Sequence, residues 1–442
     1  MRLAPVVAFG ITVACAQVAA ANPLTMFGSG ARASSMGGAH TAGARDSSAN
    51  FYNPALLASL PTLELDLSYR LARPDLRLND NDVGVDVARG TELSVAVPGE
   101  VAGMRLGVGV SVYLPDQHLM RIRSLSQTQP RFALYDNRPQ RLFLAVNFGF
   151  AITDALSIGG GLGYLTATSG GVTLTGRVGF PDANDSNLVL DMDVDITTRA
   201  YPIAGVAYQL KPWLRLGAAY RGAVQPVTDL SIDIEGDIGA AMREPIVADA
   251  AVNLRSISLS HFQPAEVSLG LEAWLRESLV VVADLSLHRW SGFENPAAQL
   301  ESALELGQFN EFLTPPAPAS LAAANYHDIL IPRIGVEWRT LHRRHMTLHS
   351  RAGYSYEPSP APEQVGVTNF VDNDKHTASL GLGLSLRDWT AIFLEPLSLD
   401  LSFAATKLAR RDHQKLSPVD PIGDYHSEGT VWQVGITNRL RF

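Results

Sequence analysis

The chain is poor in cysteine, in long apolar runs and in basic residues, and each shortage narrows the class of protein. One cysteine, Cys15, occurs in 442 residues, so no internal disulfide can form. Beyond residue 21 no stretch approaches the roughly 18 uncharged apolar residues of a transmembrane helix. The 35 Lys and Arg residues are outnumbered by 44 Asp and Glu residues, giving a net charge of −9. Nucleic acid is therefore not an expected partner, because no basic stripe is present to neutralise phosphates.

The N-terminus has the pattern of a secretion signal. A short positive start is followed by an apolar stretch that ends at Ala14 and by small residues through Ala21. We expect a signal peptide over residues 1–21, with the mature chain starting at Asn22. A lipoprotein anchored at Cys15 is a weaker alternative, since Thr12 fits that signal poorly. Without Cys15 the mature chain has no thiol for catalysis or metal binding.

Apolar and polar residues alternate along about fourteen segments of the mature chain. In the last segment Trp432, Val434 and Ile436 share one face of a strand, whereas Thr437 and Arg439 share the other. Short and long connections also alternate between the segments, as expected for periplasmic turns and extracellular loops. The sequence therefore predicts an all-β protein, an antiparallel transmembrane β-barrel of about fourteen strands over residues 62–442, in the outer membrane.

Residues 22–61 lack this alternation and are rich in Gly, Ala and Ser. A short helix is expected after Asp46 and before the Asn53-Pro54 pair, because the residue before a proline disfavours helix. We interpret the segment as a compact N-terminal hatch (plug) that fills the barrel.

Several patterns suggest chemistry, and each has a plainer interpretation. The histidines at 342, 345 and 349 match no standard zinc spacing, which favours a solvated cationic turn. The alternating carboxylates from Asp191 to Asp195 share one strand face and would not wrap a calcium ion. No nucleophile elbow accompanies the Ser, His and Asp residues. We therefore expect no enzyme, no metal and no cofactor, and keep an outer-membrane hydrolase as a weak alternative.

The stretch Pro296–Phe312 has apolar residues at helical spacing, namely Leu300, Leu304 and Phe309. It is expected to be helical, and either to cap the barrel or to form an apolar capture surface.

Blocks of sequence along most of the mature chain carry a resemblance to one family. They are Gly30–Ala39 with Asp46–Ala55, then Trp213–Arg221, Pro264–Leu271 with Trp290–Phe293, and Arg351–Pro362 with Asp372–Gly383. In these blocks the chain resembles the FadL/TodX family of outer-membrane transporters for long-chain fatty acids and other hydrophobic compounds. The resemblance implies passive, diffusion-driven transport of such a small molecule. One departure is the connection at 169–189, which looks short and Gly/Asp-rich for a family whose extracellular loops form an apolar capture groove.

The resemblance also implies a lateral gate where the third strand kinks beside the end of the hatch. Here the hatch residues are Asn53, Pro54 and Ala55, and the strand at 102–114 carries Gly103 and Gly107. Glycine weakens a strand and allows close backbone approach. The alternatives are that the glycines only make room for the plug, and that the solute passes straight through the hatch.

A cationic residue in the lumen could pair with a carboxylate head group. Arg105, Arg141 and Arg351 have the strand parity of lumen-facing residues. A structural or receptor barrel that transports nothing remains the competing class. The terminal Phe442 resembles the aromatic recognised by the barrel-assembly machinery, so its deletion should lower the assembled amount. Besides this machinery, the solute and membrane lipid we expect no partner, and a monomer.

Overall fold

The computed structural model describes residues 23–116, 126–136, 142–179, 186–225, 227–239, 247–259, 262–305, 310, 320–387 and 395–442. The predicted signal peptide lies outside the described residues. Among the described helices, none is long and apolar enough to cross a membrane.

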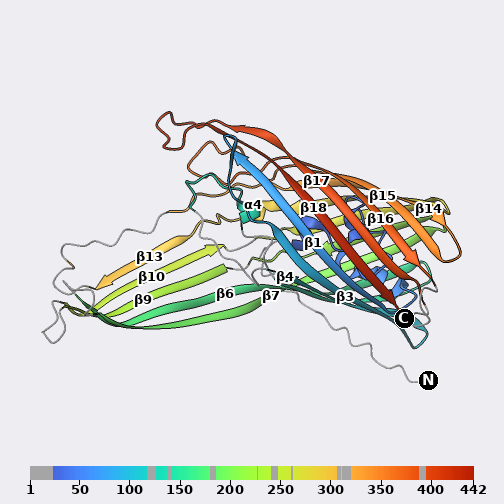
Figure 1. The fold of residues 1–442 in the computed structure, drawn as a ribbon, viewed down its shortest axis with the longest axis horizontal. Helices are drawn as coiled ribbons and strands as arrows, with labels where there is room; N and C mark the ends of the chain where they lie inside the picture. Colours follow the sequence, from blue (N-terminus) through green and yellow to red (C-terminus); the bar gives the residue numbers. More distant parts are fainter. Residues whose placement is uncertain are drawn as a thin grey trace, which may run out of the picture.

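Fourteen strands form a closed antiparallel barrel (Figure 1). Each strand is hydrogen-bonded to the next, and the last pairs with the first from Glu64↔Arg441 to Leu78↔Ser427. In order around the wall they are β1 (Glu64–Leu78), β3 (Ala88–Val101), β4 (Met104–Pro115), β5 (Phe143–Ala151), β6 (Leu156–Gly179), β7 (Asn187–Lys211), β8 (Leu214–Arg221), β11 (Ala265–Arg276), β12 (Leu279–Arg289), β14 (Ile329–His342), β15 (Met346–Glu357), β16 (Lys375–Leu386), β17 (Leu397–His413) and β18 (Tyr425–Arg441). The predicted fold class is thereby confirmed.

The wall is apolar outside and polar inside, as the alternation predicts. On β18 the outward side chains of Trp432 and Val434 are 47% and 51% exposed, whereas Thr437 and Arg439 are buried in the interior. The backbone N–H of Phe442 donates to the carbonyl of Leu63 at 3.0 Å. The assembly role of this terminal aromatic stays a prediction.

The hatch lies inside the barrel and consists of short helices. They are α1 (Pro23–Phe27), α2 (Ala31–Ser34), α3 (Ala49–Tyr52) and the 3-10 helix η1 (Pro54–Ser59). The helix expected after Asp46 is confirmed as α3. The Asn53 side chain accepts a hydrogen bond from the backbone N–H of Ala55 at 3.1 Å and so caps η1, with Pro54 at its first position.

Loop segments fold over the mouth of the barrel and pack as an apolar cap. They include α4 (Ala133–Asp136) and the 3-10 helix η3 (Trp290–Gly292). The rings of Phe262 and Trp290 stack with centroids 5.1 Å apart, and Phe293 meets Phe262 edge-on at 4.8 Å. The cap therefore lies over the lumen, where Phe27 of the hatch joins its apolar cluster.

A five-stranded sheet projects beyond the barrel (Figure 1). β6 and β7 continue past the wall and are joined by β9 (Val227–Gly239), β10 (Val247–Leu259) and β13 (Gln299–Glu305), in the order β7-β6-β9-β10-β13. A short β2 (Asn81–Asp82) pairs with β1. The expected loop at 169–189 is wrong in large part, because β6 and β7 extend into it. The expected helix over 296–312 is also wrong, since residues 299–305 form β13; Phe309 lies outside the described residues.

Candidate functional site

A cavity lies between the hatch and the inner wall. Its volume is about 110 Å³, and it is lined by Leu24, Phe27, Tyr52, Arg221, Ile331 and Arg333, among others. A second cavity of about 60 Å³, lined in part by Trp290 of the cap, shares Thr25, Met26 and Phe27 with it. The lumen therefore holds two adjoining compartments beneath the apolar cap, and both border α1.

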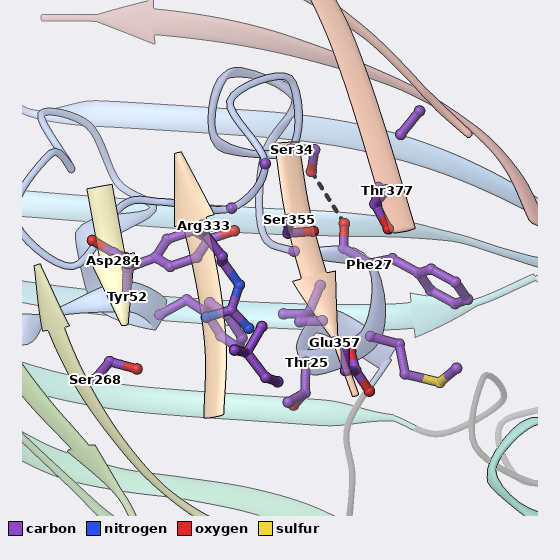
Figure 2. A pocket seen from close by; sticks show the side chains of 18 of the residues that line it. Thr25, Phe27, Ser34, Tyr52, Ser268, Asp284, Arg333, Ser355, Glu357 and Thr377 are labelled. Atoms are coloured by element: carbon purple, nitrogen blue, oxygen red, sulfur yellow. Dashed lines mark hydrogen bonds between the residues drawn. The ribbon is translucent and has the colours of Figure 1, made fainter. Parts of the chain in front are cut away.

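Arg333 of β14 points into the first cavity among side chains from the hatch and the wall (Figure 2). Its Nη1 donates to the hydroxyl of Ser286 at 2.5 Å. None of the described carboxylates has an oxygen within 4.0 Å of its guanidinium. The cavity is lined by two arginines and by the carboxylates of Glu266, Asp284 and Glu357. Of the two arginines, Arg333 is the one without a direct ionic partner among the described residues.

The other charged groups around this cavity are engaged. Arg221 pairs with Glu266, with Nη1 and Oε2 2.5 Å apart, and stacks on the ring of Phe51 at 4.2 Å. Asp284 accepts hydrogen bonds from the backbone N–H groups of His40 and Thr41 at 2.8 and 2.9 Å. These pairings leave Arg333 as the group best placed to meet an anion.

One side of the hatch is tied to the wall by buried ion pairs. Arg32 of α2 lies 2.9 Å from Glu337 of β14, measured from Nε to Oε2. Asp46 lies 2.9 Å from Nη2 of Arg439 on β18, and Arg439 reaches Asp66 of β1 at the same distance. This charged anchor fastens the hatch to the arc of wall formed by β14, β18 and β1.

Two titratable groups of the hatch have shifted pKa values. Burial, reinforced by the Arg32 charge, lowers the pKa of His40 to about 3. Burial alone would raise the pKa of Asp46, but Arg439 and Arg32 outweigh it and hold that pKa below its usual range. The docked hatch therefore contains a neutral histidine beside an ionised carboxylate.

The opposite side of the hatch rests on glycine backbone, as the ion-paired side also does at Gly335, Gly353 and Gly381. Register pairs align Gly107 of β4, Gly149 of β5, Gly159 of β6 and Gly205 of β7 in one row. A Cβ atom at Gly107 would lie 2.3 Å from the carbonyl oxygen of Leu57, and one at Gly159 would lie 2.4 Å from the nitrogen of Ala55. Residues Pro54–Ser59 thus lie directly on the backbone of this glycine row. On the outside of the same wall is an apolar depression lined by Phe148, Phe150, Ile158, Gly159 and Gly160.

The predicted gate residues divide into two groups. Asn53 donates to the carbonyls of Thr41 and Val206 at 2.8 and 3.0 Å, which ties the hatch to β7. Gly107 lies beneath the hatch, but Gly103 does not: it has a φ of +79° in the turn after β3, and a Cβ atom there would have no other atom within 4 Å. Its glycine serves the positive φ of the hairpin turn.

The third strand of the wall, β4, has a continuous ladder on each side. It pairs with β3 from Gly90↔Pro115 to Val101↔Met104 and with β5 from Leu106↔Phe150 to Tyr113↔Phe143, with no register shift in either ladder. The opening that the resemblance implies at this strand stays a prediction.

Of the three predicted cationic residues, Arg105 and Arg351 do not line the described cavities. Arg351 is buried beneath the hatch, where Nε lies 2.6 Å from Glu337 and Nη1 lies 2.6 Å from Asp400. Arg105 is exposed near the turn after β3, 3.3 Å from Asp154. Arg141 lies outside the described residues. Strand parity indicates which way a side chain points, but not how far along the barrel the cavity lies, and so it missed Arg333.

The other sequence candidates occupy exposed positions. Asp191, Asp193 and Asp195 lie on β7 in the projecting sheet. Across the described parts of the chain, no three His, Cys, Asp or Glu side chains are placed to hold a metal ion.

An antiparallel barrel with an apolar exterior and a lumen filled by its own N-terminal segment is a plugged outer-membrane barrel. The family model of the outer membrane protein transport proteins (OMPP1/FadL/TodX) matches residues 7–442. The chain belongs to this family, which confirms the resemblance and the outer-membrane location.

Individual relatives are distant in sequence. Alkane uptake protein A of Marinobacter nauticus is 23% identical over 406 residues, which cover 85% of this chain and 81% of that protein. The crystal structure of a Pseudomonas aeruginosa FadL homologue has a TM-score of 0.54 at 16% identity, with 96% of this chain and 98% of that chain covered. The Pseudomonas putida toluene transporter TodX gives 0.54 at 17% identity, with 96% and 100% covered. These structures support the fold.

Proposed function

We propose that this protein carries long-chain fatty acids or similar hydrophobic small molecules passively across the outer membrane. The observation that supports this best is the Arg333 charge in a cavity that Leu24, Phe27 and Ile331 also line. A carboxylate head group at Arg333 would form a charge-assisted hydrogen bond, and an acyl chain would bury its surface against the apolar residues at roughly 25 cal/mol per Å².

A neutral hydrocarbon is the second candidate. Two relatives favour it, because one is an alkane uptake protein and the other a toluene transporter. Such a solute would use the apolar surfaces but gain nothing from Arg333. Uptake of a fatty acid should therefore depend on Arg333, whereas uptake of a hydrocarbon should not.

We further propose that the solute leaves sideways through the wall between β5 and β6. There the hatch lies on Gly149 and Gly159 inside, and the apolar depression lies outside. Exit there would need two changes: η1 must move away from the glycine row, and the β5–β6 ladder, which is continuous from Phe143↔Leu165 to Ala151↔Ser157, must separate locally. The charged anchor on the opposite arc would hold the hatch in the barrel meanwhile. A straight path through the hatch would instead require the buried ion pairs to separate.

Uptake of labelled oleate, hexadecane and toluene by a deletion strain, with and without the restored gene, tests the function. A gain in oleate uptake on restoration is expected. No gain with any of the three solutes would contradict transport and favour a structural or receptor role.

A further inference from the structure

The projecting sheet has one continuous apolar face. Its register pairs place one row of aliphatic side chains across all five strands: Leu190, Leu174, Ile234, Val252 and Leu304. The adjacent row carries Met192, Val172, Ile232 and Leu254. The side chains of Leu190 and Met192 are 58% and 57% exposed. The face is therefore a broad aliphatic surface in contact with solvent.

The opposite face of this sheet is acidic. It carries Asp191, Asp193, Asp195, Asp229, Asp233, Glu235, Glu301 and Glu305. Arg255 of β10 binds Asp229 with Nη2 and Oδ2 2.6 Å apart, and its Nη1 lies 3.9 Å from Glu301. These cross-strand pairs show that the charged side chains share one side of the sheet.

The apolar face continues the lipid-facing surface of the barrel. Ile158 and Leu162 on β6, and Val206 and Tyr208 on β7, are exposed on the outer wall. The β6–β7 ladder runs from Leu156↔Tyr208 to Arg177↔Asn187 without a register shift. Because side chains alternate with a period of two, the even-numbered residues stay on the same face along both strands. The even-numbered face that meets acyl chains on the wall therefore leads into the apolar rows, with Thr166 and Thr198 between the two apolar areas.

This hairpin is much longer than a membrane requires. β6 has 24 residues and β7 has 25, whereas a transmembrane strand needs about 9–11. More than half of each strand thus lies beyond the hydrocarbon layer, with its apolar side turned to water.

We propose that this face adsorbs to the surface of a liquid hydrocarbon and holds the mouth of the barrel at the oil–water boundary. The inference rests on the proposed function, because adsorption brings the solute to a transporter. The described side chains of the two rows are Leu, Ile, Val and Met, as on a lipid-facing wall. They include none of the Trp, Tyr or Arg residues that dominate binding energy in protein interfaces. The acidic face remains in water, as the polar side of an interfacial element does.

The size of the face also favours a liquid over a second copy of the chain. The next row on this face carries Val194, Leu230 and Leu300. From the usual strand and residue spacings, the three rows together cover roughly 500 Å². A stable protein–protein interface buries about 800 Å² on each partner. A liquid surface requires neither a complementary shape nor a minimum area.

Adjacent residues on opposite faces provide a direct test. Met192→Cys and Asp193→Cys variants of the full-length protein, placed in lipid nanodiscs, each give one labelling site, because Cys15 is expected to leave with the signal peptide. Each is labelled with an environment-sensitive fluorophore and mixed with hexadecane droplets. We expect a blue shift for the label at position 192 and none for the label at 193.

Three outcomes would overturn the inference. The first is no shift at position 192, or equal shifts at both positions. The second is an equal shift at 192 with phospholipid vesicles in place of droplets, which would make the occupant a membrane. The third is a shift at 192 without droplets that grows with protein concentration, which would indicate a second copy.

Substitutions on the two faces separate this inference from the proposed function. A combined Leu190→Thr, Met192→Thr, Val194→Thr variant should lose about tenfold or more of its co-flotation with droplets. The matched Asp191→Asn, Asp193→Asn, Asp195→Asn variant should float as the unmodified protein does. Both should take up oleate normally when it is supplied as a soluble cyclodextrin complex, and heat-modifiable gel bands check that both are folded.

If the unmodified protein takes up cyclodextrin-bound oleate but does not float with droplets, the adsorption inference is wrong and the transport function stands. If it floats with droplets but takes up no solute in any form, transport is wrong.

Discussion

Arg32 of the hatch and Glu337 of β14 form a buried ion pair, and Glu337 also binds Arg351 of the neighbouring strand. The side chains of Arg32 and Glu337 are 8% and 9% exposed. One wall carboxylate is thus shared between a wall arginine and a hatch arginine. Removing the hatch partner leaves the wall pair intact, so this contact can be weakened without breaking the barrel.

Replacing Arg32 by alanine should loosen the hatch. Breaking one partner of a buried pair costs on the order of 3–5 kcal/mol, and Asp46 and Glu337 keep other arginines, so a value at the low end is expected. Larger and more frequent current steps in planar bilayers should follow. Arg105→Ala, at an exposed arginine near a turn, is the control. Identical currents for Arg32→Ala and the unmodified protein would show that this pair does not hold the plug.

Acid should loosen the hatch as well. The pKa of His40 falls to about 3 in the docked hatch, below its usual value near 6.5. The undocked hatch therefore binds the proton more readily, and docking weakens as the pH falls below about 6.5. After correction for the slower intrinsic exchange at low pH, the protection factors of hatch amides should fall by at most about tenfold per pH unit down to pH 4.

Asp46 acts in the same direction at lower pH, because its pKa is also held below the usual range. Its contribution is full above about pH 4 and is lost as the pH falls further. A His40→Gln variant should show a flatter exchange profile between pH 6.5 and 4. An unchanged profile would mean that another group titrates.

Replacing Gly107 by valine should displace η1. Its Cβ would meet the Leu57 carbonyl at 2.3 Å, so either the hatch or the wall must shift. We expect faster proteolysis of the hatch, higher leak and altered uptake, with a normal heat-modifiable barrel. Gly103→Asn is the matched control, since asparagine tolerates a positive φ and no atom lies near that Cβ. Unaltered leak and uptake in Gly107→Val, with the side chain confirmed in the wall, would argue against an exit at the glycine row.

Replacing Arg333 by glutamine should discriminate between solutes. Loss of one charge-assisted hydrogen bond, worth about 1.5–3 kcal/mol, should lower oleate binding roughly tenfold or more. Hexadecane uptake should not change, and Arg333→Lys should retain part of the oleate affinity. Equal losses for oleate and hexadecane would indicate a structural role for Arg333.

The barrel could be predicted from the sequence because its wall follows one rule. Asp66 between Leu65 and Leu67 requires a polar face opposite an apolar one, and repetition of that pattern along the chain gives a closed sheet. The projecting sheet follows the same rule, so alternation alone could not separate it from the wall. β6 pairs with β9 in parallel, far from the barrel seam. This pairing depends on register, which alternation does not determine. The Leu300 and Leu304 spacing fits a helix and a strand face equally well.

Fewer residues around the cavity and the glycine row could be predicted from the sequence. Asn53 and Gly107 were found from the resemblance, whereas Gly149, Gly159 and Gly205 join them only when four strands are aligned. Arg333 follows Pro332 in a strand without a distinctive sequence pattern. Nothing in the sequence shows that the other charged groups around Arg333 are already paired.

Arg439 has a consequence for how the protein folds. It belongs to the final strand, yet it binds Asp66 of the first strand and Asp46 of the hatch. Until the two ends of the chain meet, neither carboxylate has this partner, and a seam closed without the hatch would leave part of a buried cluster uncompensated. Contacts between residues so distant in sequence form late, because the loop between them must close first. Sealing the barrel and seating its plug are therefore coupled into one late step of folding.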